Sequence, residues 1–123
     1  MDDDRVWAFE ESLWTASPEH YAESIDAACL MVVPAPPFVL GGEAAVAAVS
    51  NTPRWSAVRF SEQKVSRPQE GLIVVAYGVE ASREGETYVA HCTSTYRWLS
   101  HEVWKVVQHQ QTPPLVVGGP AEG

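Results

Sequence analysis

The second half of the chain consists of four successive strand-like segments, and this pattern restricts the fold more than any other feature. The segments cover residues 55–65, 72–82, 87–99 and 103–111. Only short connections separate them, at residues 67–71, 83–86 and 100–101. Short connections between alternating segments are typical of antiparallel hairpins. The sequence therefore predicts a four-stranded antiparallel meander.

Three helices are expected ahead of this meander. Residues 6–16 repeat apolar side chains at helical spacing behind the acidic start MDDDR, and negative charge is favourable at a helix N-terminus. Ser17 and Pro18 have the residue types of an N-cap and a first helical position, so a second short helix should reach about Asp26. A third helix is expected over residues 42–50 (GEAAVAAVS), and the apolar run 29–33 should be a further strand.

This order of elements predicts an α+β domain in which the helices cover one face of the sheet. The chain has 123 residues, which is the size of one typical domain. We expect a single domain over residues 1–113. Residues 114–123 are rich in Pro and Gly and should form an extended or flexible tail.

The charge of the chain argues against several classes of partner. Sixteen acidic and eight basic residues give a formal net charge of -8, which repels phosphate backbones and anionic lipids. No apolar run approaches the roughly 18 residues of a membrane-spanning helix. The acidic start is unlike a secretory signal, so we expect a cytoplasmic protein with reduced thiols at Cys29 and Cys92. Neither nucleic acid nor membrane is an expected partner.

The last hairpin ends in an unusually polar run, EVWKVVQHQQTPP (residues 102–114). If residues 100 and 101 form a two-residue turn, Leu99 pairs with Glu102 and Cys92 lies opposite His109. Because side chains alternate between the two faces of a strand, one face then collects five residues that suit a lined cavity better than a plain core: Cys92, Ser94, Tyr96, His109 and Gln111.

The opposite face of this hairpin should be a flat surface able to pair with a second copy of the chain. A one-residue slip in the turn would exchange the two faces. The residues predicted to form a dimer interface on this surface are Thr93, Thr95, Trp104, Val106 and Gln108.

The order of elements, the ending WKVVQHQQ (residues 104–111) and the preceding TSTY (residues 93–96) resemble the nuclear transport factor 2-like superfamily. Within it, the chain is most similar to SnoaL-like and small uncharacterised bacterial members, from about Val6 to Pro113. The resemblance implies a cystatin-like cone, in which a curved, mostly antiparallel sheet wraps around three N-terminal helices. It also implies a pocket between sheet and helices, and a homodimer built on the sheet.

The resemblance leaves the activity open, because the superfamily includes isomerases, dehydratases, cyclases and hydrolases as well as members that only bind or assemble. In the ketosteroid isomerase type, a carboxylate base works with a Tyr and a protonated Asp. This chain offers Tyr21, Tyr96 and Asp26, but it has Ser94 and His109 where acids would be expected.

His109 and Tyr96 are the predicted catalytic pair, since a His can take a proton near neutral pH while a Tyr hydroxyl stabilises negative charge. The alternative is a His that is hydrogen-bonded in a polar pocket wall. Cys92 and His109 could instead form a nucleophile and its base, although a buried Cys is usually a small hydrophobe. Asp26 could raise the pKa of His109, or it could be a solvated residue at a helix end.

The aromatic residues suggest a flat, apolar ligand, because five Trp is a high number for so short a chain. The alternative role of these rings is core packing. The predicted ligand-binding residues are Trp14, Tyr21, Trp55, Cys92, Ser94 and Gln111. The four His lack metal-ligand spacing and the Gly pairs do not form a phosphate loop, so neither a metal nor a cofactor is expected.

Three functional hypotheses follow from the sequence. The first is a protein that binds a small, apolar, cyclic molecule in the cone cavity. The second is a cofactor-free isomerase, lyase or cyclase that uses His109 and Tyr96 for acid/base catalysis. The third is a dimeric assembly module without a ligand.

Overall fold

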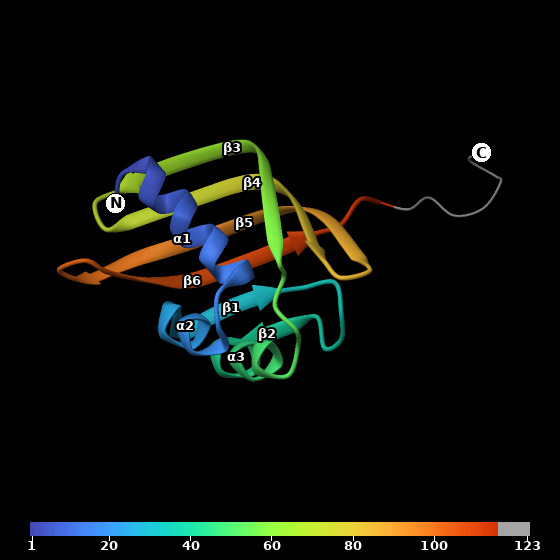
Figure 1. Ribbon diagram of the computed structural model, residues 1–123. Coiled ribbons are helices and arrows are strands. Elements are labelled where there is room, and N and C mark those ends of the chain that lie inside the picture. The colour runs from blue at the N-terminus through green and yellow to red at the C-terminus, as the bar shows by residue number, and fades with distance from the viewer. Residues whose placement is uncertain (116–123) are drawn as a thin grey trace.

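The computed structural model describes residues 1–115, which form three helices and one six-stranded sheet (Figure 1). The helices are α1 (Asp3–Thr15), α2 (Pro18–Ser24) and α3 (Gly42–Ser50). The strands are β1 (Ile25–Val32), β2 (Val39–Gly41), β3 (Ala57–Gln69), β4 (Leu72–Arg83), β5 (Glu86–Ser100) and β6 (Val103–Thr112). The predicted α+β class is confirmed. The predicted tail lies outside the described residues, except for Pro114 and Leu115.

The sheet has the order β2-β1-β6-β5-β4-β3, so β3 to β6 form the predicted antiparallel meander. β1 joins the meander by pairing in parallel with β6. The short strand β2 was not predicted, because three residues are too few for a period of two to be recognised. It pairs with the end of β1 and borders the sheet.

Local sequence signals position the helices. Asp2 caps α1 by accepting a hydrogen bond from the backbone N–H of Arg5 at 2.9 Å. Ser17 caps α2 in the same way, as predicted, and Pro18 takes the first helical position. α2 ends at Ser24, two residues earlier than expected, because β1 begins directly at Ile25.

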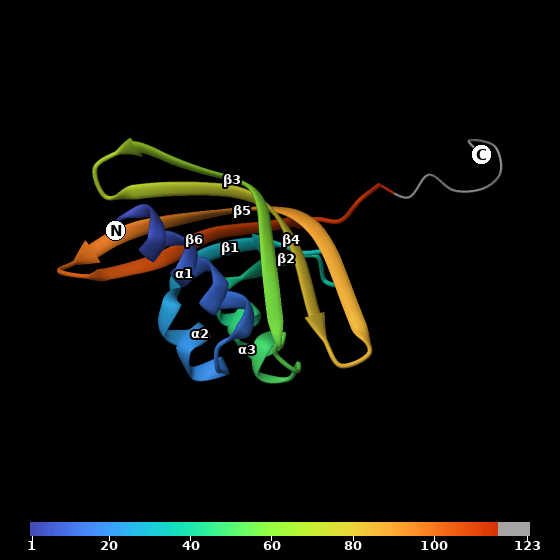
Figure 2. The same ribbon diagram turned by 45° about the horizontal axis from the view of Figure 1, so that its top comes forward.

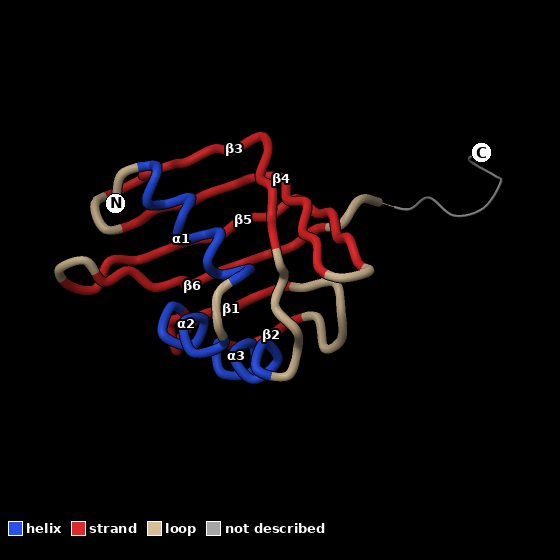
Figure 3. Tube along the Cα trace, viewed as in Figure 1, coloured by secondary structure: helices blue, strands red, loops and turns tan. Residues whose placement is uncertain are grey.

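The sheet is curved, and the helices lie on its concave side (Figures 1 and 2). Figure 3 shows that α1 crosses over the meander, whereas α2 and α3 lie beside β1 and β2. A bulge between Ser61 and Lys64 changes the direction of β3. In Figure 2 the tip of the β4–β5 hairpin bends toward the level of the helices. This bend closes one side of the space between sheet and helices.

The register of the last hairpin differs from the prediction. The turn lies at His101 and Glu102, and His109 is opposite Ser94 instead of Cys92. The difference is two residues over this part of the hairpin, so the predicted face with Cys92, Ser94, Tyr96, His109 and Gln111 is retained.

A bulge in the same hairpin moves one part of β6 to the other face. The register shifts between Thr95 and Tyr96, which places Val106 opposite Tyr96 on the helix side of the sheet. Val106 is fully buried, and Trp104, two residues earlier on the strand, also packs against the core. Both were predicted on the open face, and an irregular ladder of this kind cannot be derived from simple alternation.

None of the helices in residues 1–115 is long and apolar enough to cross a membrane. The core lies between α1 and the sheet, where Val6, Val75 and Tyr96 have no exposed surface. Arg54 attaches the chain segment after α3 to the end of α1, since its guanidinium donates hydrogen bonds to the carbonyl oxygens of Leu13 and Ala16.

Candidate functional site

A cavity of about 420 Å³ lies between the helices and the concave side of the sheet, and it opens to solvent. α1, α2 and α3 contribute one part of its wall, and β1, β6 and the β4–β5 hairpin contribute another. Most of its surface is apolar. The aliphatic part of the wall consists of Leu13, Ile25, Met31, Leu40, Ala45, Val49 and Val106.

Three aromatic rings form one side of this cavity. Trp55 and Tyr88 are stacked, with ring centroids 6.0 Å apart and an interplanar angle of 18°. The ring centroid of Trp14 lies 6.4 Å from that of Tyr88. The guanidinium of Arg83 lies 4.0 Å from the centroid of the Trp55 ring and supports it by a cation–π contact. Flat aromatic surfaces of this kind suit a planar apolar molecule.

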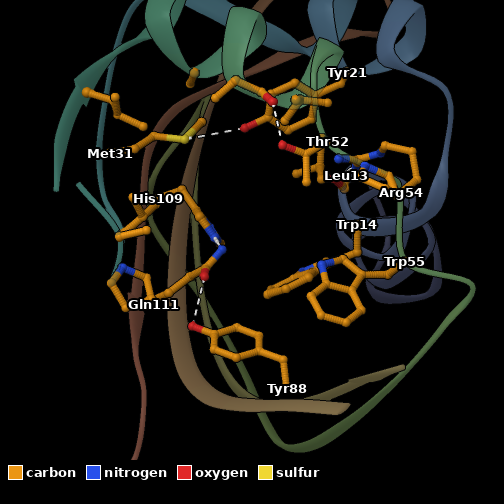
Figure 4. A pocket seen from close by; sticks show the side chains of 18 of the residues that line it. Leu13, Trp14, Tyr21, Met31, Thr52, Arg54, Trp55, Tyr88, His109 and Gln111 are labelled. Atoms are coloured by element: carbon orange, nitrogen blue, oxygen red, sulfur yellow. Dashed lines mark hydrogen bonds between the residues drawn. The ribbon is translucent and has the colours of Figure 1, made fainter. Parts of the chain in front are cut away.

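The polar groups of the cavity come from the end of β6. Figure 4 shows His109 and Gln111 on one side of the opening, with Trp14 and Trp55 facing them. The Tyr88 hydroxyl donates a hydrogen bond to Gln111 Oε1 at 2.9 Å. Gln111 Nε2 lies 3.2 Å from His109 Nε2. A ligand in this cavity would therefore meet a pair of neighbouring polar side chains at one edge.

A buried hydrogen-bond network lies behind His109 and is centred on Glu10 of α1. The Glu10 carboxyl has no exposed surface and accepts hydrogen bonds from the hydroxyls of Tyr77 and Tyr96. Ser94 Oγ lies 2.7 Å from Glu10 Oε2 and also 2.7 Å from His109 Nδ1. His109 Nδ1 is 3.8 Å from Glu10 Oε2. Ser94 thus connects a buried carboxyl to an imidazole in the cavity wall.

Glu10 is the main residue of this region that the sequence interpretation missed. It lies four residues after Val6 and three before Leu13, which places it on the buried stripe of α1. An acidic residue on an apolar stripe is unusual, because burying a charge requires hydrogen-bonding partners. This signal was present in the sequence, but its partners lie on strands 67 to 86 residues away.

Burial sets the protonation behaviour of these groups. It raises the pKa of Tyr77 and of Tyr96 far above the ordinary tyrosine value, and the nearby Glu10 charge adds to the effect. Burial lowers the pKa of His109, and the attraction of Glu10 opposes this only in part. His109 is therefore a neutral imidazole at pH 7 and both tyrosines are hydroxyl donors.

Tyr96 does not reach the cavity, although it was predicted to act with His109. Its hydroxyl donates to Glu10 and its ring packs edge-on against Phe9, with centroids 4.9 Å apart. Of the predicted ligand-binding residues, those in the cavity wall are Trp14, Tyr21, Trp55 and Gln111, joined by His109. Ser94 and Cys92 lie outside the wall. Ser94 is hydrogen-bonded to the side of His109 that points away from the cavity.

Cys92 lacks the surroundings of a nucleophile. It pairs with Gln111 in the ladder and is 4% exposed. Burial, followed by the charge of Glu10, raises the pKa of the Cys92 thiol to about 12. At pH 7 this thiol carries its proton, so it has the properties of a small buried hydrophobe.

Asp26 lies away from the cavity and is not a solvated helix end. It is a buried residue of β1, and its carboxylate pairs with the guanidinium of Arg97, with Nη2 and Oδ2 2.7 Å apart. The backbone N–H of Ala28, at 2.8 Å, lowers the pKa of Asp26, and Arg97 lowers it further. Asp26 therefore holds two strands together and does not act on His109.

The open face of the sheet carries the other predicted interface residues. Thr95 donates a hydrogen bond to Gln108 Oε1 at 3.0 Å, and Gln108 Nε2 donates to Thr93 at 3.2 Å. Leu30 and Val32 are paired with Gln108 and Gln110, and both are exposed. This face thus combines a polar ladder with exposed aliphatic side chains.

Within residues 1–115, no group of three or more His, Cys, Asp and Glu side chains is arranged to hold a metal ion.

The chain has the nuclear transport factor 2-like fold, as its resemblance predicted. It superposes with a TM-score of 0.78 on a candidate ketosteroid isomerase from Parabacteroides distasonis, at 16% identity over 93% of this chain and 89% of that chain. A nuclear transport factor 2-like protein from Cytophaga hutchinsonii gives 0.72, at 18% identity over 93% and 99% of the two chains.

A further similar structure is a nuclear transport factor 2-like protein of unknown function in nutrient uptake from Rhodospirillum rubrum. It gives a TM-score of 0.71 at 16% identity over 92% of this chain and 95% of that chain. No family model matches the sequence, and a comparison with curated proteins finds no significant relative. At these identities the similar structures establish the fold, and the function has to be argued from the site.

Proposed function

We propose that the protein binds a small, flat, largely apolar cyclic molecule in the cavity of the cone. The observation that carries this proposal is a cavity of about 420 Å³ that the stacked rings of Trp55 and Tyr88 line together with His109 and Gln111. Ligand sites are typically apolar cavities of roughly 300–1,000 Å³ with a few convergent polar groups. The rings would contact the faces of the ligand, and the polar pair would orient one substituent.

A thermal-shift screen with bicyclic aromatic compounds tests this proposal. A ligand at a hundred times its dissociation constant should stabilise the fold by about 2.7 kcal/mol. Trp55→Ala should abolish the shift, because it removes one of the stacked rings. Trp98→Ala is the matched control, since Trp98 is half-exposed and lies outside the cavity wall. Equal shifts for wild type and both variants would contradict binding at this site.

A second proposal is a cofactor-independent isomerase or lyase activity. The observation that favours it is that His109 Nε2 lies at the cavity while Nδ1 is connected through Ser94 to Glu10. Such an imidazole could take a proton from a substrate. Tyr96 would act only by positioning Glu10, whereas the Tyr88 hydroxyl lies in the cavity and is hydrogen-bonded to Gln111. Turnover that is lost in His109→Gln, with the fold retained, would support catalysis.

We also propose that two copies of the chain pair through the open face of the sheet. Thr93, Thr95 and Gln108 would form the centre of this interface, next to the exposed side chains of Leu30 and Val32. Sedimentation velocity of wild type and Thr95→Arg tests this proposal. A wild-type dimer that dissociates in Thr95→Arg is expected, whereas a monomeric wild type would refute it.

A further inference from the structure

The direction of the hydrogen bonds around Glu10 is fixed at one end by Trp14. The indole Nε1–H of Trp14 lies 3.0 Å from the hydroxyl oxygen of Tyr77, and an indole can only donate. Tyr77 therefore accepts from Trp14 and uses its own proton for Glu10. Tyr96 donates to the other carboxyl oxygen. These contacts are those of an ionised carboxylate, which accepts hydrogen bonds and donates none.

The Ser94 hydroxyl determines which nitrogen of His109 carries the proton. An ionised Glu10 requires the Ser94 proton, since Ser94 Oγ is 2.7 Å from Glu10 Oε2. The oxygen lone pairs of Ser94 then remain for His109 Nδ1, also at 2.7 Å, and this contact needs a proton on Nδ1. Because a neutral imidazole carries one proton, Nε2 has none. The contact between His109 Nε2 and Gln111 Nε2 is consistent with an unprotonated His109 Nε2, since the Gln111 amide can then donate a hydrogen bond to it.

We infer that His109 presents an unprotonated Nε2 to the cavity, and that the ligand is a flat apolar ring with a hydroxyl group that donates to this nitrogen. This inference rests on the proposed binding function and names the polar group of its ligand. The hydroxyl would replace the Gln111 amide as the donor to His109 Nε2 and would accept a hydrogen bond from that amide. An ether or a ketone can only accept from the Gln111 amide, so it makes one hydrogen bond fewer than a hydroxyl, which can also donate to His109 Nε2.

The first test measures the direction of the network in the free protein. The 15N chemical shifts of the His109 side chain distinguish a protonated from a bare ring nitrogen. We expect a proton on Nδ1 and a bare Nε2 in wild type at pH 7.5. A proton on Nε2 would overturn the inference, because the network would then run in the opposite direction. This measurement needs no ligand, so it is independent of the proposed binding function.

The second test compares two probes of nearly equal shape, 2-naphthol and 2-methoxynaphthalene, by isothermal titration calorimetry. Wild type should bind the naphthol about tenfold more tightly, because the ether can accept from Gln111 but cannot donate to His109 Nε2. Ser94→Ala should reduce this preference, since it removes the group that holds the proton on Nδ1. Thr95→Ala is the control, because Thr95 is the next residue on β5 but its hydroxyl bonds to Gln108 on the open face.

The outcomes separate the two claims. Equal binding of both probes by wild type would refute the hydroxyl specificity while supporting the cavity as a binding site. Binding of neither probe would count against the proposed function, and the nitrogen shifts would still decide the state of His109. If Ser94→Ala does not fold, the wild-type nitrogen shifts and the wild-type probe preference decide the inference without it.

Discussion

Tyr96→Phe separates a structural role of Tyr96 from a catalytic one. The side chain has no exposed surface. Within residues 1–115, Glu10 Oε1 accepts a hydrogen bond from the Tyr96 hydroxyl alone, whereas Oε2 accepts from both Tyr77 and Ser94. The substitution keeps the edge-on ring contact with Phe9. It removes the Tyr96 donor from Oε1 of the buried Glu10 carboxyl.

The expected loss in the free energy of unfolding is about 2 kcal/mol, because hydrogen bonds to charged groups contribute roughly 1.5–3 kcal/mol. For a chain of 123 residues this corresponds to a decrease in Tm of roughly 8 °C, from an unfolding entropy of about 2.1 cal/mol/K per residue. Urea denaturation at pH 7.5 measures the change directly. Ligand affinity should not change, since Tyr96 is outside the cavity wall.

Tyr88→Phe is the matched control. The hydroxyl of Tyr88 donates to Gln111 inside the cavity, so its loss should cost little stability but should alter ligand binding. The opposite pattern would refute this reasoning: a loss below about 0.5 kcal/mol for Tyr96→Phe, together with a loss of binding or turnover in a folded protein. Such a result would return Tyr96 to the catalytic role that the sequence suggested.

Three further predictions concern pH and packing. The pKa of His109 is lower in the folded protein, so as pH decreases His109 is protonated first in the unfolded chain. The free energy of unfolding should therefore fall as pH decreases from the unfolded pKa of about 6.5 to the folded pKa. The slope should be at most about 1.4 kcal/mol per pH unit. In pH-dependent urea denaturation, this part of the slope should be absent from His109→Gln and present in the control His101→Gln. The pKa of Asp26 is lowered by hydrogen bonds to its charged form. The stabilisation by Asp26 is therefore complete above about pH 4 and should be lost as pH falls through the folded pKa. Asp26→Asn should then weaken the decrease of unfolding free energy at acidic pH. Replacement of the buried Ile73 by Val should cost about 1 kcal/mol of unfolding free energy in urea, and no measurable cost would show that this part of the core is not close-packed.

Much of the architecture follows from local sequence. The apolar spacing and the Ser17-Pro18 cap give the helices, and the short connections after residue 55 give the antiparallel meander. α3 has the predicted bounds, Gly42–Ser50, because an Ala-rich run between breaking residues has strong local signals at both ends. The grouping of Cys92, Ser94, Tyr96, His109 and Gln111 on one face also follows from alternation alone, since a two-residue error in register leaves that face unchanged.

The functional assignment of these residues depends on tertiary structure. The bulge at Thr95 and Tyr96 moves Val106 into the cavity wall, and no local sequence signal predicts it. The fold brings Glu10 to Tyr96, 86 positions away, which removes Tyr96 from the cavity and places Ser94 between a carboxylate and His109. The sequence determined which side chains share a face, because strand geometry is local. Only the packing of α1 against that face decided which of them meet a ligand and which meet Glu10.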